Sequence, residues 1–177
     1  MQSDKRNDDF MIVLACEGIC EVQLMQRLLE SNSLLFGIKD ILDRRPIHLR
    51  QPKSIMPLIN ILPIDEKIVF YRIGDTQKDE FDISCFGQTR RENINVFKVC
   101  TKPEIEVLII INEKLYSDYL KVKSKIAPKQ FVKDHLHDYT DFIDYINNHD
   151  LLWAIEEYKR IKQNNKDEMY LDDLIKK

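Results

Sequence analysis

Three short hydrophobic runs mark the predicted interior of the protein. Residues 10–16, 67–73 and 94–99 are dominated by aliphatic and aromatic side chains, with turn-forming or polar residues between the runs. Short apolar runs of this kind are typical of strands buried on both faces of a parallel sheet. We therefore predict an α/β fold in which these three segments lie in one central, mostly parallel sheet with helices on its faces.

Helical spacing follows the first run. Between residues 19 and 36 the apolar positions recur every three or four residues, and charged or amide side chains stand between them. This pattern predicts an amphipathic helix that is weakened at residues 31–33, where Ser-Asn-Ser interrupts it. The apolar positions of the predicted helix are Val22, Met25, Leu28 and Leu29.

The segment from residue 40 to residue 66 contains four of the six prolines. Because proline lacks a backbone N–H and disrupts the preceding turn, we expect no continuous helix in this segment. Residues 47–49 are predicted as a short strand. Residues 58–62 are predicted as a second short strand, with a helix as the alternative.

A helix start is predicted after the third run. Thr101 and Glu104 have the spacing of a capping box, and Pro103 is favoured in a first turn. Residues 107–111 are all apolar and would suit a strand by propensity, but the capping pattern favours a helix that is buried nearly all round.

The remainder of the chain is predicted to be helical. From Pro128 onward, apolar side chains are spaced among many charges, and a short last helix is expected around residues 169–175. We therefore expect an α/β domain over residues 9–125 and a helical C-terminal extension over residues 126–177 that packs on it.

Composition narrows the classes of function. The 177 residues are 44% hydrophobic and 32% charged, with a net charge of −3, which is typical of a soluble globular protein without bulk attraction to nucleic acid. No apolar stretch reaches the roughly 20 residues of a membrane span, and the polar N-terminal segment does not resemble a secretory signal. We expect a cytoplasmic protein with no membrane partner, whose four cysteines are free thiols.

Acidic side chains follow the first two runs. Glu17 comes directly after residues 10–16, and Asp75 follows residues 67–73 with Asp79 and Asp82 close behind. In open α/β sheets, ligands bind at the carboxyl ends of the strands. Carboxylates from two such ends can hold Mg²⁺, which needs few protein ligands because it keeps several waters. The spacing predicts a divalent cation site.

Three arginines flank this acidic segment. Arg72 lies just before it, and Arg90 and Arg91 lie just after it. Since arginine can bind phosphate oxygens in a bidentate manner, we predict that these residues contact nucleic acid. The basic clusters over residues 44–53, which include Arg50, and over residues 114–133 are further candidates for binding phosphate. Runs of charge are more often solvated faces, and that interpretation is favoured for both clusters.

The acidic elements resemble those of the Toprim (topoisomerase–primase) domain. The sequence Leu-Ala-Cys-Glu-Gly at residues 14–18 is similar to the strand–Glu–Gly element of that family, and residues 75–79 fall where the family carries Asp-x-Asp. Residues 102–106 resemble the Pro-x-x-Glu helix start of small Toprim-like proteins in bacterial defence and abortive-infection systems. The resemblance covers residues 9 to about 120. Gln77 occupies the second aspartate position, so the choice among Asp75, Asp79 and Asp82 stays open.

The resemblance implies a metal-dependent nuclease acting on DNA or RNA. It implies catalytic roles for Glu17, Asp75 and Asp79, with Glu17 as general base or acid and Mg²⁺ or Mn²⁺ as cofactor. Asp82 is a further candidate ligand, and Glu21 and Glu106 are supporting residues. It also implies a role as the effector of an antiphage defence system, with an ATPase partner protein and a homo-oligomer as candidate assemblies.

Two other interpretations of the same residues remain. Asp75, Asp79 and Asp82 are also typical of a solvated turn, and Glu17 is also typical of the first turn of a helix, where the dipole favours acidic residues. At the level of function, the alternative is a non-catalytic Toprim-like module for protein interaction or nucleotide sensing in a multiprotein complex.

Overall fold

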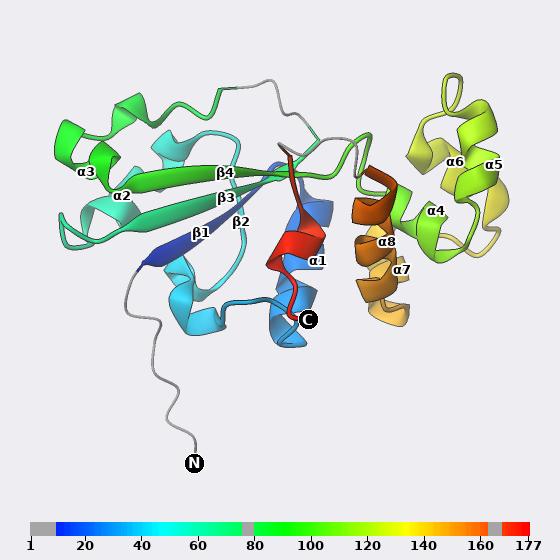
Figure 1. The fold of residues 1–177 in the computed structure, drawn as a ribbon, viewed down its shortest axis with the longest axis horizontal. Helices are drawn as coiled ribbons and strands as arrows, with labels where there is room; N and C mark the ends of the chain where they lie inside the picture. The colour runs from blue at the N-terminus through cyan, green and yellow to red at the C-terminus, as the bar shows by residue number, and fades with distance from the viewer. Residues whose placement is uncertain (1–9, 76–79, 163–167) are drawn as a thin grey trace, which may run out of the picture.

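The central sheet is confirmed. The computed structural model describes residues 10–75, 80–162 and 168–177. Within this part of the chain, the strands form one five-stranded sheet in which every neighbouring pair is parallel (Figure 1). The strands are β1 (Met11–Cys16), β2 (Ile47–His48), β3 (Ile68–Gly74), β4 (Ile94–Cys100) and β5 (Met169–Tyr170), and they lie in the order β2-β1-β3-β4-β5.

Burial on both faces explains the continuous apolar pattern of β1. Its register runs from Met11 opposite Ile68 to Cys16 opposite Ile73, and all six residues of the strand are buried. Alternate side chains enter different cores because successive residues of a strand point to opposite faces. Ile12, Leu14 and Cys16 lie in one core, and Met11, Val13 and Ala15 lie in the other.

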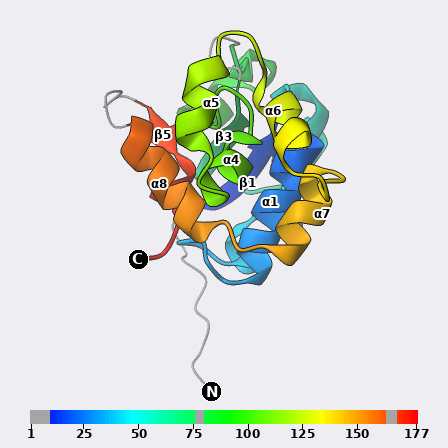
Figure 2. The same cartoon turned by 90° about the vertical axis from the view of Figure 1, so that its right-hand side faces the viewer.

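Helices cover both faces of the sheet unequally. The larger core joins one face to α1 and to the cluster formed by α4 to α8, whereas α2 and short 3₁₀ segments cover the other face. Figure 2 shows α4 to α8 grouped in front of the sheet, around its carboxyl end. The helices are α1 (Ile19–Glu30), α2 (Met56–Asn60), α3 (Gln88–Glu92), α4 (Val107–Asn112), α5 (Tyr116–Val122), α6 (Pro128–His135), α7 (Phe142–Asn148) and α8 (Leu152–Lys162). The 3₁₀ segments are η1 (Ile38–Asp40), η2 (Leu42–Arg44), η3 (Pro52–Ile55), η4 (Ile83–Cys85) and η5 (Leu171–Leu174).

Two helix boundaries differ from the sequence prediction. Helix α1 ends at Glu30, and Asn32 takes a left-handed backbone conformation with φ 56°, so the Ser-Asn-Ser segment ends the helix. Thr101 does not cap a helix, because its N–H donates to the carbonyl of Gly74 (3.1 Å) and so continues the ladder between β3 and β4. Helix α4 begins at Val107 after a loop, and its residues 107–111 are all buried, as predicted.

The other short elements follow the prediction in part. Residues 47–48 form β2, and the helical alternative for residues 58–62 is correct, since α2 covers Met56–Asn60. The four cysteines are free thiols. Among the described residues, no helix has the length and hydrophobicity needed to cross a membrane.

The C-terminal segment completes the sheet. We expected a helix around residues 169–175, but Met169–Tyr170 pair with Val99–Cys100 as β5 before the 3₁₀ turn η5. Lys159 of α8 forms ion pairs with Asp172 and with Asp173 of η5. The segment 126–177 therefore packs on the α/β core through helices and also contributes its last strand.

Candidate functional site

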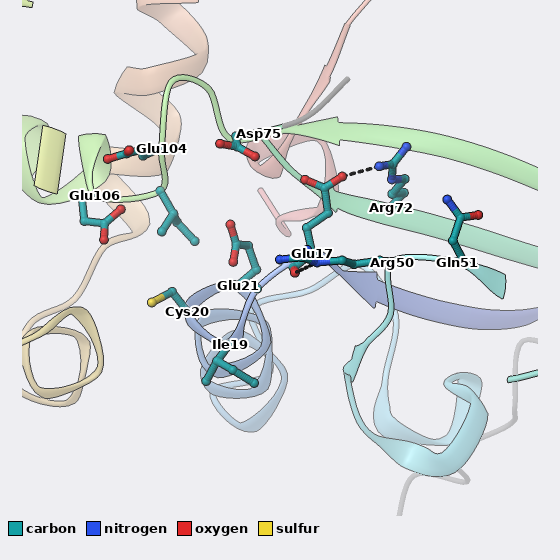
Figure 3. Close-up of a pocket in the computed structure, with 12 residues that line it drawn as sticks. Glu17, Ile19, Cys20, Glu21, Arg50, Gln51, Arg72, Asp75, Glu104 and Glu106 are labelled. Atoms are coloured by element: carbon teal, nitrogen blue, oxygen red, sulfur yellow. Dashed lines mark hydrogen bonds and ion pairs between the residues drawn. The ribbon is translucent and has the colours of Figure 1, made fainter. Parts of the chain in front are cut away.

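A cavity of about 530 Å³ opens at the carboxyl ends of the strands (Figure 3). It lies where the chain leaves β1 for α1 on one face of the sheet and leaves β3 for residues 80–86 on the other. Such a switch point between neighbouring strands is where open α/β sheets bind ligands. The lining residues come from the ends of β1, β2, β3 and β4: Glu17, Gly18, Ile19, Cys20, Glu21, Arg50, Gln51, Arg72, Asp75, Glu104, Ile105 and Glu106.

Glu17 is held by contacts on both its backbone and its side chain. Its N–H donates to the carbonyl of Ile73 (2.9 Å), which carries the pairing of β1 and β3 one residue past the strand. Its carboxylate accepts a hydrogen bond from Arg72 within a mostly buried ion pair, whose side chains are 12% and 4% exposed respectively. The Glu17 carbonyl accepts from His48 Nε2 (3.0 Å) and from Arg50 Nε (3.4 Å).

Two glycines provide the space for two carboxylates. A Cβ atom at Gly74 would lie 2.1 Å from Oε2 and 2.5 Å from Cγ of Glu17. A Cβ at Gly18 would lie 2.6 Å from Oε2 of Glu21. Neither glycine has a positive φ, so these positions exclude a side chain by lack of space and not by backbone strain.

Burial and neighbouring charges together raise the pKa of two of the carboxyl groups. Burial raises the pKa of Glu21, and the neighbouring charges of Asp75, Glu106 and Glu17 raise this pKa further. Burial likewise raises the pKa of Glu106, with contributions from Glu104 and Asp75. These are the shifts expected where like charges share a partly desolvated site.

The two predicted aspartates that the structure describes, Asp75 and Asp82, lie in different places. Asp75 lines the cavity beside Glu17 and Glu21, whereas Asp79 lies outside the described residues. Asp82 is not among the lining residues. Its carboxylate accepts hydrogen bonds from the N–H and the hydroxyl of Ser84 (both 2.8 Å), which cap η4 and lower the pKa of Asp82.

The three predicted phosphate-binding arginines also separate. Arg72 reaches the cavity but is engaged with Glu17. Arg90 is only 4% exposed and donates to the carbonyls of Leu62 and Pro63 (2.7 Å each), which gives it a structural role. Arg90 and the exposed Arg91 lie on α3, which directly precedes β4. They are therefore at the amino-terminal end of the strands, opposite to the end where Glu17 lies.

Sequence reasoning missed two charged lining residues and one amide. Arg50, Gln51 and Glu104 line the cavity, although none was singled out as part of the site. Arg50 lies two residues past β2, and Glu104 lies four residues past β4. Both follow a strand of the same sheet, which is the signal that pointed to Glu17 and Asp75.

The donor chemistry of the cavity fits a hard cation. In the described ranges, no three His, Cys, Asp or Glu side chains are already grouped in an arrangement that could hold a metal ion. Mg²⁺ nevertheless needs only one or two carboxylates because it retains bound water, and Glu17, Glu21 and Asp75 offer such oxygens. Cys20 supplies the one thiol among the described lining residues, so the donors of the cavity are chiefly carboxylate oxygens, which suit a hard cation.

No family model matches the chain, and no solved structure matches it significantly. The resemblance to Toprim domains therefore stays a prediction that rests on residues 14–18, 75–79 and 102–106 and on an α/β fold consistent with it.

Proposed function

We propose that this protein is a Mg²⁺- or Mn²⁺-dependent phosphodiesterase of the Toprim-like class that acts on DNA or RNA. The observation that carries the proposal is the convergence of Glu17, Glu21, Asp75 and Glu106 in one cavity at the carboxyl edge of a parallel sheet. Burial and neighbouring negative charges raise the pKa of Glu21 and of Glu106, so a cation bound beside them would relieve part of this repulsion.

In this proposal, different side chains of the cavity bind the cation and transfer the proton. Glu17 and Asp75 would hold the cation, and the hydrogen bond from Arg72 fixes the orientation of the Glu17 carboxylate. A bound Mg²⁺ or Mn²⁺ would polarise the phosphate and lower the pKa of a coordinated water. Glu21 suits proton transfer because its pKa is raised, which is the direction a carboxyl needs to exchange a proton near neutral pH.

The proposal is tested by a pair of matched substitutions. Glu17→Gln keeps the shape of the side chain and removes its charge, so Mn²⁺-dependent cleavage of labelled single-stranded DNA, duplex DNA and RNA should be lost. Glu157→Gln is the control, because Glu157 is paired with Arg160 on the surface of α8, away from the cavity. Cleavage that survives in Glu17→Gln, or that is absent from the wild type with every substrate, would contradict the proposal.

A non-catalytic module is the second candidate, and one observation favours it. The mostly buried ion pair with Arg72 already neutralises Glu17, the residue on which a catalytic cation would depend. Isothermal titration with Mn²⁺ separates the two candidates. If the wild type does not bind Mn²⁺, and Glu17→Gln preserves its biological phenotype, the interaction module is correct.

The role in antiphage defence, the ATPase partner and homo-oligomerisation are proposals that come from the Toprim resemblance alone. Co-purification of the tagged full chain from its native cell, with and without the Glu17→Gln substitution, addresses them. A nuclease effector should recover the same partner in both forms and act only in the wild type.

A further inference from the structure

The two arginines that line the cavity are in different states. Arg72 is buried on β3, bound to Glu17 and packed over the ring of Phe81 (5.8 Å from its guanidinium carbon to the ring centroid). Arg50 is exposed, and it enters the cavity from the end of β2. The two side chains therefore cannot have the same function.

The contacts of Arg50 orient its guanidinium toward the cavity. Figure 3 shows the side chain extending beneath Glu17 toward the space in front of Glu21. Its Nε donates to the carbonyl of Glu17 (3.4 Å), and within the described part of the chain no hydrogen bond or ion pair engages its two Nη groups. Arginine binds phosphate most strongly through such pairs of N–H donors.

The segment that carries Arg50 is itself anchored. Gln51 Nε2 donates to the carbonyl of Glu80 (3.2 Å), and the N–H of Asp82 donates to Gln51 Oε1 (3.4 Å). The segment that follows β2 is thereby hydrogen-bonded to Glu80 and Asp82. Arg50 therefore lies beside the carboxylates of the cavity, but it approaches them from the end of β2, whereas Glu17 and Asp75 follow β1 and β3.

We infer that Arg50 is the phosphate-binding residue of this site: its Nη groups bind non-bridging oxygens of a phosphate ester or anhydride held against the cation. The inference rests on the proposed function and specifies the substrate class by charge. Glu17, Glu21, Asp75, Glu104 and Glu106 would repel an anion, so a phosphate needs both the cation and a neighbouring positive side chain to enter.

Binding of inorganic pyrophosphate to the full chain in Mg²⁺, measured by calorimetry, tests this role without any turnover. Arg50→Met should weaken pyrophosphate binding by about 10- to 100-fold, the effect of losing hydrogen bonds to a charged group, and should leave Mg²⁺ binding intact. Arg50→Lys should recover part of the loss, because it keeps the charge but not the paired donors. Arg45→Met is the matched control: it removes the same charge from a 69% exposed arginine that pairs with Asp43 outside the cavity.

A second measurement uses hydrolysis of bis(4-nitrophenyl) phosphate with Mn²⁺. Arg50→Met should raise KM and lower kcat/KM relative to Arg45→Met, whereas a merely structural role would lower the melting temperature and leave KM unchanged. If the wild type binds Mg²⁺ and pyrophosphate but hydrolyses nothing, and Arg50→Met loses the pyrophosphate, the proposed hydrolysis fails and the role of Arg50 stands. If the wild type does not bind pyrophosphate in Mg²⁺, or if Arg50→Met binds it as well as Arg45→Met does, the role of Arg50 is refuted.

Discussion

Replacing Gly74 by alanine should disturb the site through a single contact. A methyl group at this position would overlap the Glu17 side chain along most of its length, with Oε2 at 2.1 Å, Cδ at 2.3 Å and Cγ at 2.5 Å. The backbone of Gly74 is not in the left-handed region, so alanine itself is tolerated there. Glu17 must therefore swing away from Arg72, and their mostly buried ion pair is lost.

The size of the effect follows from two opposing contributions. Loss of a hydrogen bond between charged groups costs about 1.5–3 kcal/mol. Replacing a glycine inside a strand returns about 0.5–1 kcal/mol, because the unfolded chain has less conformational freedom to lose. The net destabilisation should be about 0.5–2.5 kcal/mol, which corresponds to roughly 1–10 °C in melting temperature for a chain of this size.

A double-mutant cycle with Glu17→Ala isolates this contact. Differential scanning calorimetry on the wild type, Gly74→Ala, Glu17→Ala and the double variant should show that Gly74→Ala destabilises only when Glu17 is present. In the Glu17→Ala background the same change should be neutral or stabilising. Equal destabilisation in both backgrounds would show that Gly74 is needed for another reason and that the close approach of Glu17 has no energetic weight.

Three more changes have expected outcomes. Asp75→Asn should weaken Mn²⁺ binding in calorimetry and lower cleavage, with activity partly restored at high Mn²⁺; unchanged affinity would remove Asp75 from the cation site. Burial raises the pKa of Glu21 in the folded chain, so ionisation of Glu21 destabilises the fold as the pH rises from about 4.5 through the raised pKa. The melting temperature of Glu21→Gln, measured in EDTA, should therefore rise above that of the wild type across this pH window and should match it at lower pH. Glu157→Gln should give the opposite trend, since Arg160 lowers the pKa of Glu157, and parallel trends for the two variants would refute the assignment. Arg90→Met should lower the melting temperature without a specific effect on nucleic-acid binding, because Arg90 is buried against backbone carbonyls; a stable variant with weakened DNA binding would restore Arg90 to the interface.

The centre of the sheet was largely predictable because β1 is buried on both faces and β3 is mostly buried. The continuous apolar runs at residues 10–16 and 67–73 predicted strands of one sheet, and the structure pairs them in register. Strand β5 could not be predicted in this way. Its two residues, Met169 and Tyr170, are too few to show a period, and their pairing with β4 depends on tertiary contacts.

The candidate site was predictable only where it depends on strand ends. Glu17 and Asp75 follow directly from the order of strands, because parallel strands bring their carboxyl ends to one edge. Arg90 was assigned to the carboxyl ends of the strands because it is close to the acidic residues along the chain. It lies on α3, which directly precedes β4, and so it is at the amino-terminal end of the strands. Arg50 was hidden in a basic cluster, since sequence does not distinguish a solvated arginine from one that enters a cavity.

The crowded carboxylates have a consequence for how this protein can change under selection. Burial penalises the charges of Glu21 and Glu106, so substitutions that neutralise either residue should relieve the fold at neutral pH. A library of variants screened for abundance in cells would enrich such substitutions, and a screen for the protein's activity would deplete them. Positions in the cavity where the two screens disagree would identify the functional residues without any knowledge of the substrate.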